Sequence, residues 1–258
     1  MSIRVYPAFM QGKGEFDGGK ITEQKPIGFP GEGSVINRIG PLYYWAWAKA
    51  PVGGHIAPHQ HEGYEIVTYV TQGTAVHRDS LGSDSRVAQG GLQIMHTGSG
   101  VSHEEEWTGP DMESFQIWLE PDLTEAWERT PKYMKYEANE FPLAYEDGVV
   151  IRTLIGTGSP AALTVDAQLQ DIELKSGKSF VKELDSGRTA AVLILEGAAR
   201  FLIPGSGEMQ AHAGTGDFVM LTSPASSGWA VTAAEDALRL LVIEVPNKVN
   251  YRLTPKKY

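Results

Sequence analysis

The sequence predicts an all-β fold that contains two copies of one β unit, and three observations support this prediction. The 258 residues include 29 glycines and 15 prolines, with few long runs of helix-forming residues. Short apolar segments recur along the chain between clusters of Gly, Asp and Ser, which is typical of strands joined by turns in a sandwich or barrel. The two halves of the chain also repeat one order of such segments.

Strand-like segments of the first half begin after Pro41. They are LYYWAWAKA (42–50), EIVTYVTQG (65–73), TAVHRDS (74–80), GLQIMHTG (91–98) and ESFQIWLEP (113–121). In the last segment Phe115, Ile117 and Leu119 alternate with more polar neighbours. This period of two residues indicates a strand with one buried face.

Residues 121–142 interrupt this pattern with charged residues, three prolines and at most one short helical turn, so we interpret them as a connection between two domains. The strand pattern then returns in VVIRTLIG (149–156), LTVDAQLQDIELKSG (163–177), TAAVLILEGAARFLIPG (189–205), GDFVMLTSP (216–224) and LRLLVIEVP (238–246). We expect an N-terminal domain over residues 1–136, connection included, and a C-terminal domain over residues 137–258.

The internal repeat aligns Gly73 with Gly197 and Gly90 with Gly216. The two copies differ in their polar residues. The second carries Glu183 and Asp185 where the first has His59 and His61, and Trp229 and Val231 where the first has His103 and Glu105. We therefore expect any chemistry to belong to the first half.

A metal site is the main functional prediction. His59 and His61 stand two residues apart, so on an extended strand both imidazoles point to one face. Alone, such a pair can be an accident of the surface. His103 and Glu105 form a second pair with the same spacing, and together the four residues offer three imidazoles and a carboxylate. The alternative for HEEEW (103–107) is a solvated acidic turn.

The donor set restricts the metal. The chain has no cysteine, so nitrogen and oxygen must bind any ion. Three nitrogens and one oxygen suit Fe(II), Mn(II), Ni(II) or Cu(II) and leave two octahedral positions open, whereas zinc would be satisfied by the four ligands alone. We expect His55, His77, His96 and His212 to be ordinary polar or core residues, with His96 also close enough in sequence to support a ligand.

Charge and hydropathy exclude several classes of protein. The formal net charge is −10, and no dense basic stripe is present, so we expect no direct contact with nucleic acid. No stretch approaches the roughly 18 apolar residues of a membrane span, and the start lacks the apolar core of a secretory signal, so we expect a cytoplasmic protein. GEFDGGKI (14–21) is not a phosphate-binding loop, because Ile21 stands where Ser or Thr must hold magnesium.

Two stretches, GGHIAPHQHEGYEIVTYVTQG (53–73) and GGLQIMHTGSGVSHEEEW (90–107), resemble the two cupin motifs in the form found in the pirin family. The resemblance implies a bicupin, in which two antiparallel jelly-roll barrels pack together. It implies iron at His59, His61, His103 and Glu105, and a degenerate second barrel without ligands. Gln60 and Glu62 replace the common Pro and Arg of the family motif.

Pirin-like proteins are known as quercetin 2,3-dioxygenases or as metal-containing regulators, so the resemblance implies an Fe(II) dioxygenase that opens flavonols such as quercetin with O2. Glu105 is the first candidate base, and Glu65 the second, since it lies four residues beyond His61. Trp45, Trp47, Tyr69 and Trp118 are candidates to wall a flat pocket. The alternatives are a redox-responsive regulator that acts through protein partners, and a storage-type bicupin without catalysis.

Overall fold

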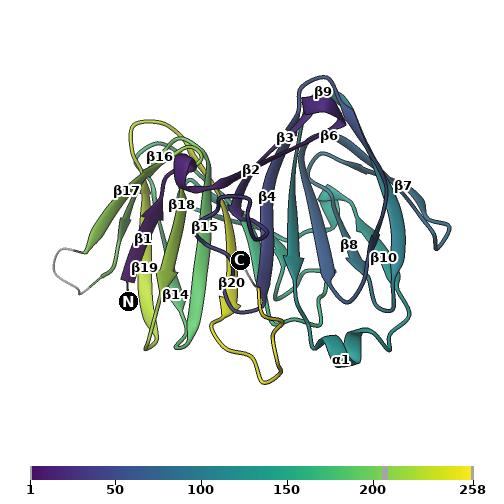
Figure 1. Cartoon of the computed structure of the whole chain (residues 1–258). Helices are drawn as coiled ribbons and strands as arrows, with labels where there is room; N and C mark the ends of the chain where they lie inside the picture. Colours follow the sequence, from purple (N-terminus) through teal and green to yellow (C-terminus); the bar gives the residue numbers. More distant parts are fainter. Residues whose placement is uncertain (1, 205–208, 257–258) are drawn as a thin grey trace. The chain divides into compact units, whose positions relative to one another are not determined.

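The computed structural model describes residues 2–204 and 209–256, and it divides into two compact β units (Figure 1). The N-terminal unit contains residues 11–140 and 249–256, and the C-terminal unit contains residues 2–10 and 141–248. Each end of the chain therefore belongs to the unit that is built from the opposite half of the sequence. Both units are antiparallel, which confirms the all-β prediction.

The N-terminal unit contains nine strands in one sheet that folds around a central cavity. Its main strand order is β10-β8-β6-β9-β4-β3-β2, with β5 beside β9 and β7 beside β6. The strands are β2 (Gly12–Phe16), β3 (Ile21–Ile27), β4 (Leu42–Ala50), β5 (Gly54–His61), β6 (Glu65–Asp79), β7 (Asp84–Ala88), β8 (Leu92–His96), β9 (Val101–Leu119) and β10 (Lys132–Tyr136).

Two long strands, β6 and β9, connect the two sides of this unit. Residues 65–72 of β6 pair with 113–119 of β9, and residues 74–79 pair with 103–108. The register shifts around Gly73, which has a φ of 78°, and a Cβ there would lie 2.8 Å from Sδ of Met112. Only glycine fits this bend without strain. The segments expected at 65–73 and 74–80 are thus one bent strand.

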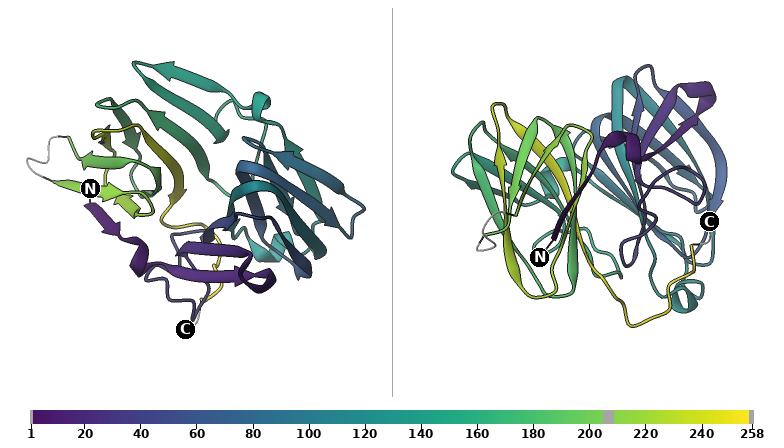
Figure 2. Two further views of the ribbon diagram at one scale, coloured as in Figure 1. Left: turned by 90° about the horizontal axis from the view of Figure 1, so that it is seen from above. Right: turned by 60° about the vertical axis from the view of Figure 1, so that its left-hand side comes forward.

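The C-terminal unit has a seven-stranded sheet, β1-β18-β15-β20-β13-β12-β11, and a four-stranded sheet, β14-β19-β16-β17. Figure 2 shows the purple N-terminal strand β1 beside the green strands of this unit, where it pairs with β18. The strands are β1 (Ser2–Tyr6), β11 (Leu143–Glu146), β12 (Val149–Ile155), β13 (Gln168–Leu174), β14 (Ser179–Leu184), β15 (Arg188–Glu196), β16 (Ala198–Leu202), β17 (Gln210–Gly214), β18 (Phe218–Thr222), β19 (Ser227–Ala233) and β20 (Leu238–Pro246).

Across residues 2–204 and 209–256, helical structure is limited to short segments. The α-helix α1 (Leu123–Ala126) is capped by Asp122, whose carboxylate accepts from the Thr124 amide, and three 3-10 turns cover Ala8–Met10, Asp17–Gly19 and Ala138–Glu140. None of the helices in the described residues is long and apolar enough to cross a membrane. Residues 121–142 were expected to contain at most one short helical turn, but they form two, α1 and the 3-10 turn at Ala138–Glu140. The same stretch also forms the edge strand β10, which the charged sequence KYMKY did not indicate.

Backbone hydrogen bonds support the internal repeat. The Gly90 amide donates to the Val70 carbonyl at 2.8 Å, and the Gly216 amide donates to the Ile194 carbonyl at 2.8 Å. Gly73 and Gly197 have φ values of 78° and 83°. The aligned glycines thus make the same turns in both units.

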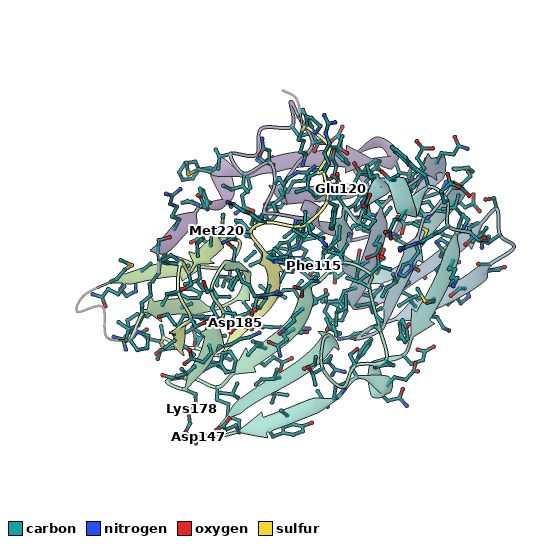
Figure 3. The ribbon with its side chains drawn as sticks, turned by 90° about the horizontal axis from the view of Figure 1, so that it is seen from below. Phe115, Glu120, Asp147, Lys178, Asp185 and Met220 are labelled. Atoms are coloured by element: carbon teal, nitrogen blue, oxygen red, sulfur yellow. The ribbon has the colours of Figure 1, made fainter. Side chains whose placement is uncertain are left out.

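Burial follows the expected alternation in β9. Phe115 (labelled in Figure 3), Ile117 and Leu119 are each at most 2% exposed. Gln116 and Trp118, on the other face, line the cavity described below. The less apolar face of this strand is therefore an interior wall of the N-terminal unit.

Candidate metal centre

Three histidines come together where β5 pairs with the first part of β9. His59 lies opposite His103 in the strand register, and His61 lies opposite Val101. The pairing of β5 shifts between Ile56 and His59, where Pro58 has no amide hydrogen to give to the sheet. Past this bulge, His59 and His61 are half-buried while Gln60 between them is exposed. The bulge therefore sets which face carries the imidazoles.

Gly53, at the start of the first motif, has a structural reason for being glycine. Its φ is 79°, and a Cβ there would approach the carbonyl oxygen of Trp107 to 2.5 Å. A side chain at this position would push β5 away from β9.

The three imidazoles are close enough to share one ion. Each offers one nitrogen, and these atoms all lie within 4.8 Å of one another. The ring centroids are 4.3 Å apart for His59 and His103, 4.7 Å for His59 and His61, and 5.0 Å for His61 and His103. The Nε2 atoms of His61 and His103 are buried and have no hydrogen-bond partner. Such atoms are costly unless something binds them, and a divalent cation fits.

Burial keeps two of these imidazoles neutral. Mainly through burial, and also through the neighbouring imidazoles, the pKa of His61 is lowered to about 3 and that of His103 to about 2. At neutral pH both rings therefore keep a lone pair for a metal.

A hydrogen-bond chain determines which nitrogen of His103 is free. Asp79 accepts from Nε2 of His77 at 2.9 Å, so Nδ1 of a neutral His77 carries a lone pair. That atom lies 3.2 Å from Nδ1 of His103, which must then carry the hydrogen. Burial lowers the pKa of His77 and keeps its ring neutral. The chain Asp79–His77–His103 therefore leaves the lone pair of His103 on Nε2, the atom that is available to a metal.

His59 is oriented by the backbone. Its Nδ1 lies 2.8 Å from the Ala57 carbonyl oxygen, to which it can only donate, so Nε2 carries the lone pair. The bulge that exposes this carbonyl thus also selects the tautomer of His59.

His77 was not expected at the site, since its sequence context suggested an ordinary polar or core residue. It is fully buried, and its ring stacks on Tyr133 at 4.3 Å. Asp79 is held in turn by the amides of Leu81 and Ser83, both at 2.9 Å. The signal available in the sequence is the spacing of two between His77 and Asp79, which puts both on one face of β6; the register places them opposite Glu105 and His103 of β9.

Glu105 lies on the same face of β9 as His103 and is 1% exposed. Its Oε2 accepts from Nε2 of Gln116 at 3.3 Å, and its Oε1 is buried without a hydrogen-bond partner. Burial raises its pKa to about 7, and the nearby Glu23 contributes to this rise. Its carboxylate is not within the 4.8 Å group of the three histidines, but it lines the same cavity.

The cavity has a volume of about 430 Å³, within the usual range of small-molecule sites. It is lined by Phe16, Glu23, Lys25, Phe29, Glu32, Tyr44, Ala48, Ile56, Ala57, His59, His61, Glu105, Trp107, Gln116 and Trp118. Of the aromatic residues expected to wall a pocket, Trp118 does so. Trp45, Trp47 and Tyr69 are buried elsewhere.

Glu65 and His96 do not line this cavity. Glu65 Oε1 lies 3.6 Å from Nε2 of His96, and both residues border a separate small pocket with Gly63 and Arg129. The structure therefore brings Glu105, and not Glu65, to the space in front of the histidines.

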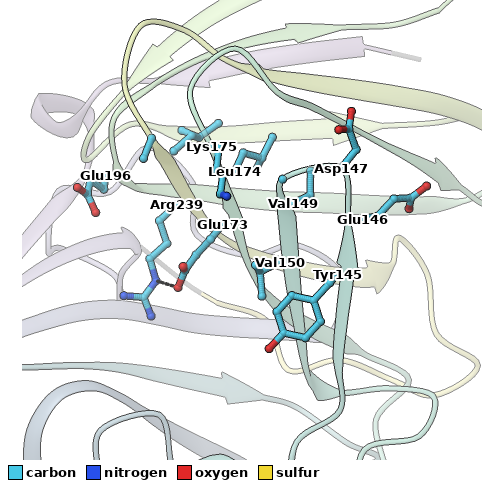
Figure 4. A pocket seen from close by; sticks show the side chains of 13 residues that line it. Tyr145, Glu146, Asp147, Val149, Val150, Glu173, Leu174, Lys175, Glu196 and Arg239 are labelled. Atoms are coloured by element: carbon cyan, nitrogen blue, oxygen red, sulfur yellow. Dashed lines mark ion pairs between the residues drawn. The ribbon is translucent and has the colours of Figure 1, made fainter.

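A second cavity, in the C-terminal unit, has a volume of about 470 Å³ (Figure 4). None of its 13 lining residues is a histidine. Arg239, on its wall, is paired with Asp171 at 2.6 Å. In the same unit Trp229 is fully buried and lies opposite Lys182, as His103 lies opposite His59. The counterpart of His59 is thus Lys182, one residue before the aligned Glu183.

Comparisons with known proteins agree with this geometry. The family model named Pirin matches residues 35–119. A pirin-like protein of Caulobacter vibrioides is 30% identical over 212 residues, which cover 78% of this chain and 75% of that protein. The chain belongs to the pirin family. A Pseudomonas aeruginosa protein named "Putative quercetin 2,3-dioxygenase" is 29% identical over 79% of this pirin and 83% of its own length.

Solved structures show the same fold. The Escherichia coli pirin YhhW in complex with nickel(II) matches with a TM-score of 0.77 at 21% identity, over 95% of this pirin and 99% of that chain. A structure of quercetin 2,3-dioxygenase from Acinetobacter baumannii matches with a TM-score of 0.77 at 20% identity, over 95% and 79%. This confirms the bicupin architecture that the sequence motifs implied.

The raised pKa of Glu105 predicts an unusual stability profile for this pirin without metal. Between pH 4.5 and 7 the folded state keeps a proton that the unfolded state has lost, so this group lowers stability as pH rises. Glu105→Gln removes that effect. We expect the stability of the variant relative to wild type to increase by about 2.5 kcal/mol between pH 5 and pH 8.

Denaturant unfolding of both metal-free proteins across this pH range measures the difference. Glu62→Gln is the matched control, because Glu62 follows directly after His61 in the same motif but is exposed. The difference in unfolding free energy between this variant and wild type should not change with pH. A Glu105→Gln difference that is flat or falls with pH would contradict the prediction.

Proposed function

We propose that this pirin is a metal-dependent dioxygenase of the quercetin 2,3-dioxygenase type, with Fe(II) as its metal and a flavonol and O2 as its substrates. The observation that carries the proposal is the group of three clustered imidazoles, of which His59 and His61 line the same aromatic-lined cavity as the buried carboxyl group of Glu105. A catalytic metal needs both a ligand set and space for a substrate, and this cavity offers the two together.

In this proposal His59, His61, His103 and Glu105 hold the metal. The fit rests on their buried, unpartnered atoms, which are Nε2 of His61 and His103 and Oε1 of Glu105. Nitrogen and oxygen donors without sulfur suit Fe(II), and Mn, Ni, Cu or Zn can occupy such a set. A bound divalent ion supplies Lewis acidity that lowers the pKa of a substrate hydroxyl, and Fe(II) also supplies redox chemistry with O2.

The residues of the chain bind the substrate and move its proton. Glu105 is the proposed base once its carboxylate is released from the metal, since this carboxyl group lines the cavity in which the substrate would bind. Gln116 holds this carboxyl by donating to Oε2, and Trp118 holds Gln116 by donating to its Oε1 at 3.0 Å. Glu65 does not line the cavity, so we assign it no proton transfer.

Two similar proteins support a substrate of the flavonol class: the Pseudomonas aeruginosa protein is named a "Putative quercetin 2,3-dioxygenase", and the Acinetobacter baumannii structure is of a quercetin 2,3-dioxygenase. The aromatic lining adds a physical reason, since Phe29, Tyr44 and Trp118 offer ring faces and edges to a flat ligand. A regulator that acts through protein partners does not need such a cavity beside its metal. The cavity therefore favours catalysis over the regulatory alternative.

The test is reconstitution with Fe(II) without oxygen, followed by quercetin and O2. We expect the flavonol absorbance to fall with one O2 consumed for each quercetin, as followed by spectrophotometry and an oxygen electrode. His55→Ala, on the same strand but exposed, should keep the activity. If Fe(II), Mn(II), Ni(II) and Cu(II) all leave quercetin unchanged, the proposed function is rejected.

A further inference from the structure

The metal cavity has a second group of buried charged residues, formed by strand β3 and the loop after it. Nζ of Lys25 lies 3.1 Å from Oε2 of Glu23 and 2.6 Å from Oε1 of Glu32. The side chains of Lys25 and Glu23 are 4% and 6% exposed. The other oxygen of Glu32 accepts from the Phe29 amide at 2.7 Å. The loop is thereby tied to β3, and all three side chains line the cavity.

A tyrosine completes this group. The hydroxyl of Tyr44, on β4, donates to Oε1 of Glu23 at 3.2 Å. Tyr44 is 2% exposed, and burial raises its pKa, so it remains a neutral phenol. Nζ of Lys25 lies 5.7 Å from the ring centre of Tyr44. The cavity wall therefore presents an acceptor, a phenol and an ammonium side by side.

Aromatic rings connect this group to the histidines. His61 meets Trp118 edge-to-face with centroids 4.7 Å apart, and Trp118 meets Phe29 in the same way at 5.2 Å. Phe29 then stacks on Tyr44 at 4.6 Å. All four rings line the cavity. A flat ligand that lies along this wall has one end at the histidines and the other at Tyr44 and Glu23.

The charges limit what the far end of such a ligand can be. With two carboxylates and one ammonium, this wall is unfavourable for a ligand that carries a carboxylate or a phosphate at its far end, because that group would face Glu23 and Glu32. A neutral hydroxyl suits it, because it can donate to a carboxylate oxygen and accept from the ammonium or the phenol. A purely structural role would tie β3 to its loop, but it would not require Tyr44 and Glu23 to border open space. Buried charges at the wall of a cavity are expensive, and ligand binding is a common reason for them.

We propose that Glu23, Lys25 and Tyr44 form a second polar subsite, which binds a phenolic hydroxyl at the end of the substrate remote from the metal. The inference rests on the proposed function, because it names which aromatic substrates that same site prefers. It selects hydroxylated flavonols over flavonols that carry only the metal-binding 3-hydroxyl.

The test compares two ligands, quercetin and 3-hydroxyflavone, which differ in their outer hydroxyls. Affinities are measured by fluorescence titration without oxygen, on the full chain loaded with Ni(II), so that no turnover intervenes. We expect wild type to bind quercetin at least about tenfold more tightly, as one hydrogen bond to a buried charged group gives. Tyr44→Phe and Glu23→Gln should each reduce this preference to less than about threefold and leave the affinity for 3-hydroxyflavone within about twofold.

Tyr43→Phe is the matched control, since Tyr43 is the neighbouring residue on β4 and does not line the cavity; Glu15→Gln, on β2, is the control for the charge. Both should keep the wild-type preference. The inference is overturned if wild type shows no preference, if Tyr44→Phe keeps it, or if the variants weaken both ligands equally. Should Glu23→Gln fold poorly, Tyr44→Phe alone decides. If wild type binds quercetin selectively in this titration but consumes no quercetin in the reconstitution test with O2, the proposed function is rejected and the subsite is kept.

Discussion

Replacing both His59 and His103 by alanine is expected to abolish metal uptake. The two residues face each other across β5 and β9, and their loss leaves His61 as the single imidazole of the group. Loss of one supporting partner of a ligand weakens metal binding about 10- to 100-fold, so removal of two ligands should cost about 1,000-fold or more. The metal content after reconstitution, measured by mass spectrometry, should fall from about one ion per chain to near zero.

The control for this experiment is the double variant His55→Ala with His212→Ala. Both residues are exposed, and His55 lies on the same strand as His59. This variant should bind metal as wild type does. Unchanged metal content in the His59 and His103 variant would show that the ligand assignment is wrong.

Breaking the hydrogen-bond chain behind His103 is expected to give the second large effect. His77→Phe keeps a flat ring beside Tyr133 but removes both ring nitrogens, so Nδ1–H of His103 loses its acceptor. The imidazole is then free to turn or to adopt the other tautomer, and we expect affinity for Ni(II) or Fe(II) to fall about 10- to 100-fold. Competition with a chelator measures this loss.

His77→Gln separates this positioning role from simple packing. The glutamine amide can donate to Asp79 and accept from His103, so it should recover most of the affinity, whereas Asp79→Asn, which removes the charge, should lose affinity as His77→Phe does. The thermal stability of the metal-free variants is measured beside it. Equal losses in the Phe and Gln variants, or a change in stability without a change in affinity, would show that His77 only fills space.

Much of the fold could be predicted because strand periodicity is local. The segments expected at 42–50 and 238–246 coincide with β4 and β20. Both are nearly continuous runs of apolar and aromatic residues, and such a short run between turn residues is enough to mark a buried strand. The edge strand β10 and the exchange of the terminal segments were missed, since an edge strand is only partly buried and the pairing of β1 with β18 joins residues more than 200 positions apart.

The sequence by itself determined the all-β class, the repeat and the ligand candidates, because each of these depends on residues close together along the chain. His59 with His61 and His103 with Glu105 are pairs at a spacing of two, and strand geometry then puts each pair on one face.

Only the tertiary structure decided what surrounds the ligands. The strand register brings Asp79 and His77 behind His103, and it brings Glu23, Lys25 and Tyr44 to the wall of the metal cavity. These contacts depend on register and on the bends at Pro58 and Gly73, and a shift of one residue would turn every side chain of a strand to its other face. The same reasoning applies to the histidine pair at 59 and 61. Its spacing of two places both imidazoles on one face, and the pairing of β5 with β9 brings that face to His103, which makes it a candidate metal centre.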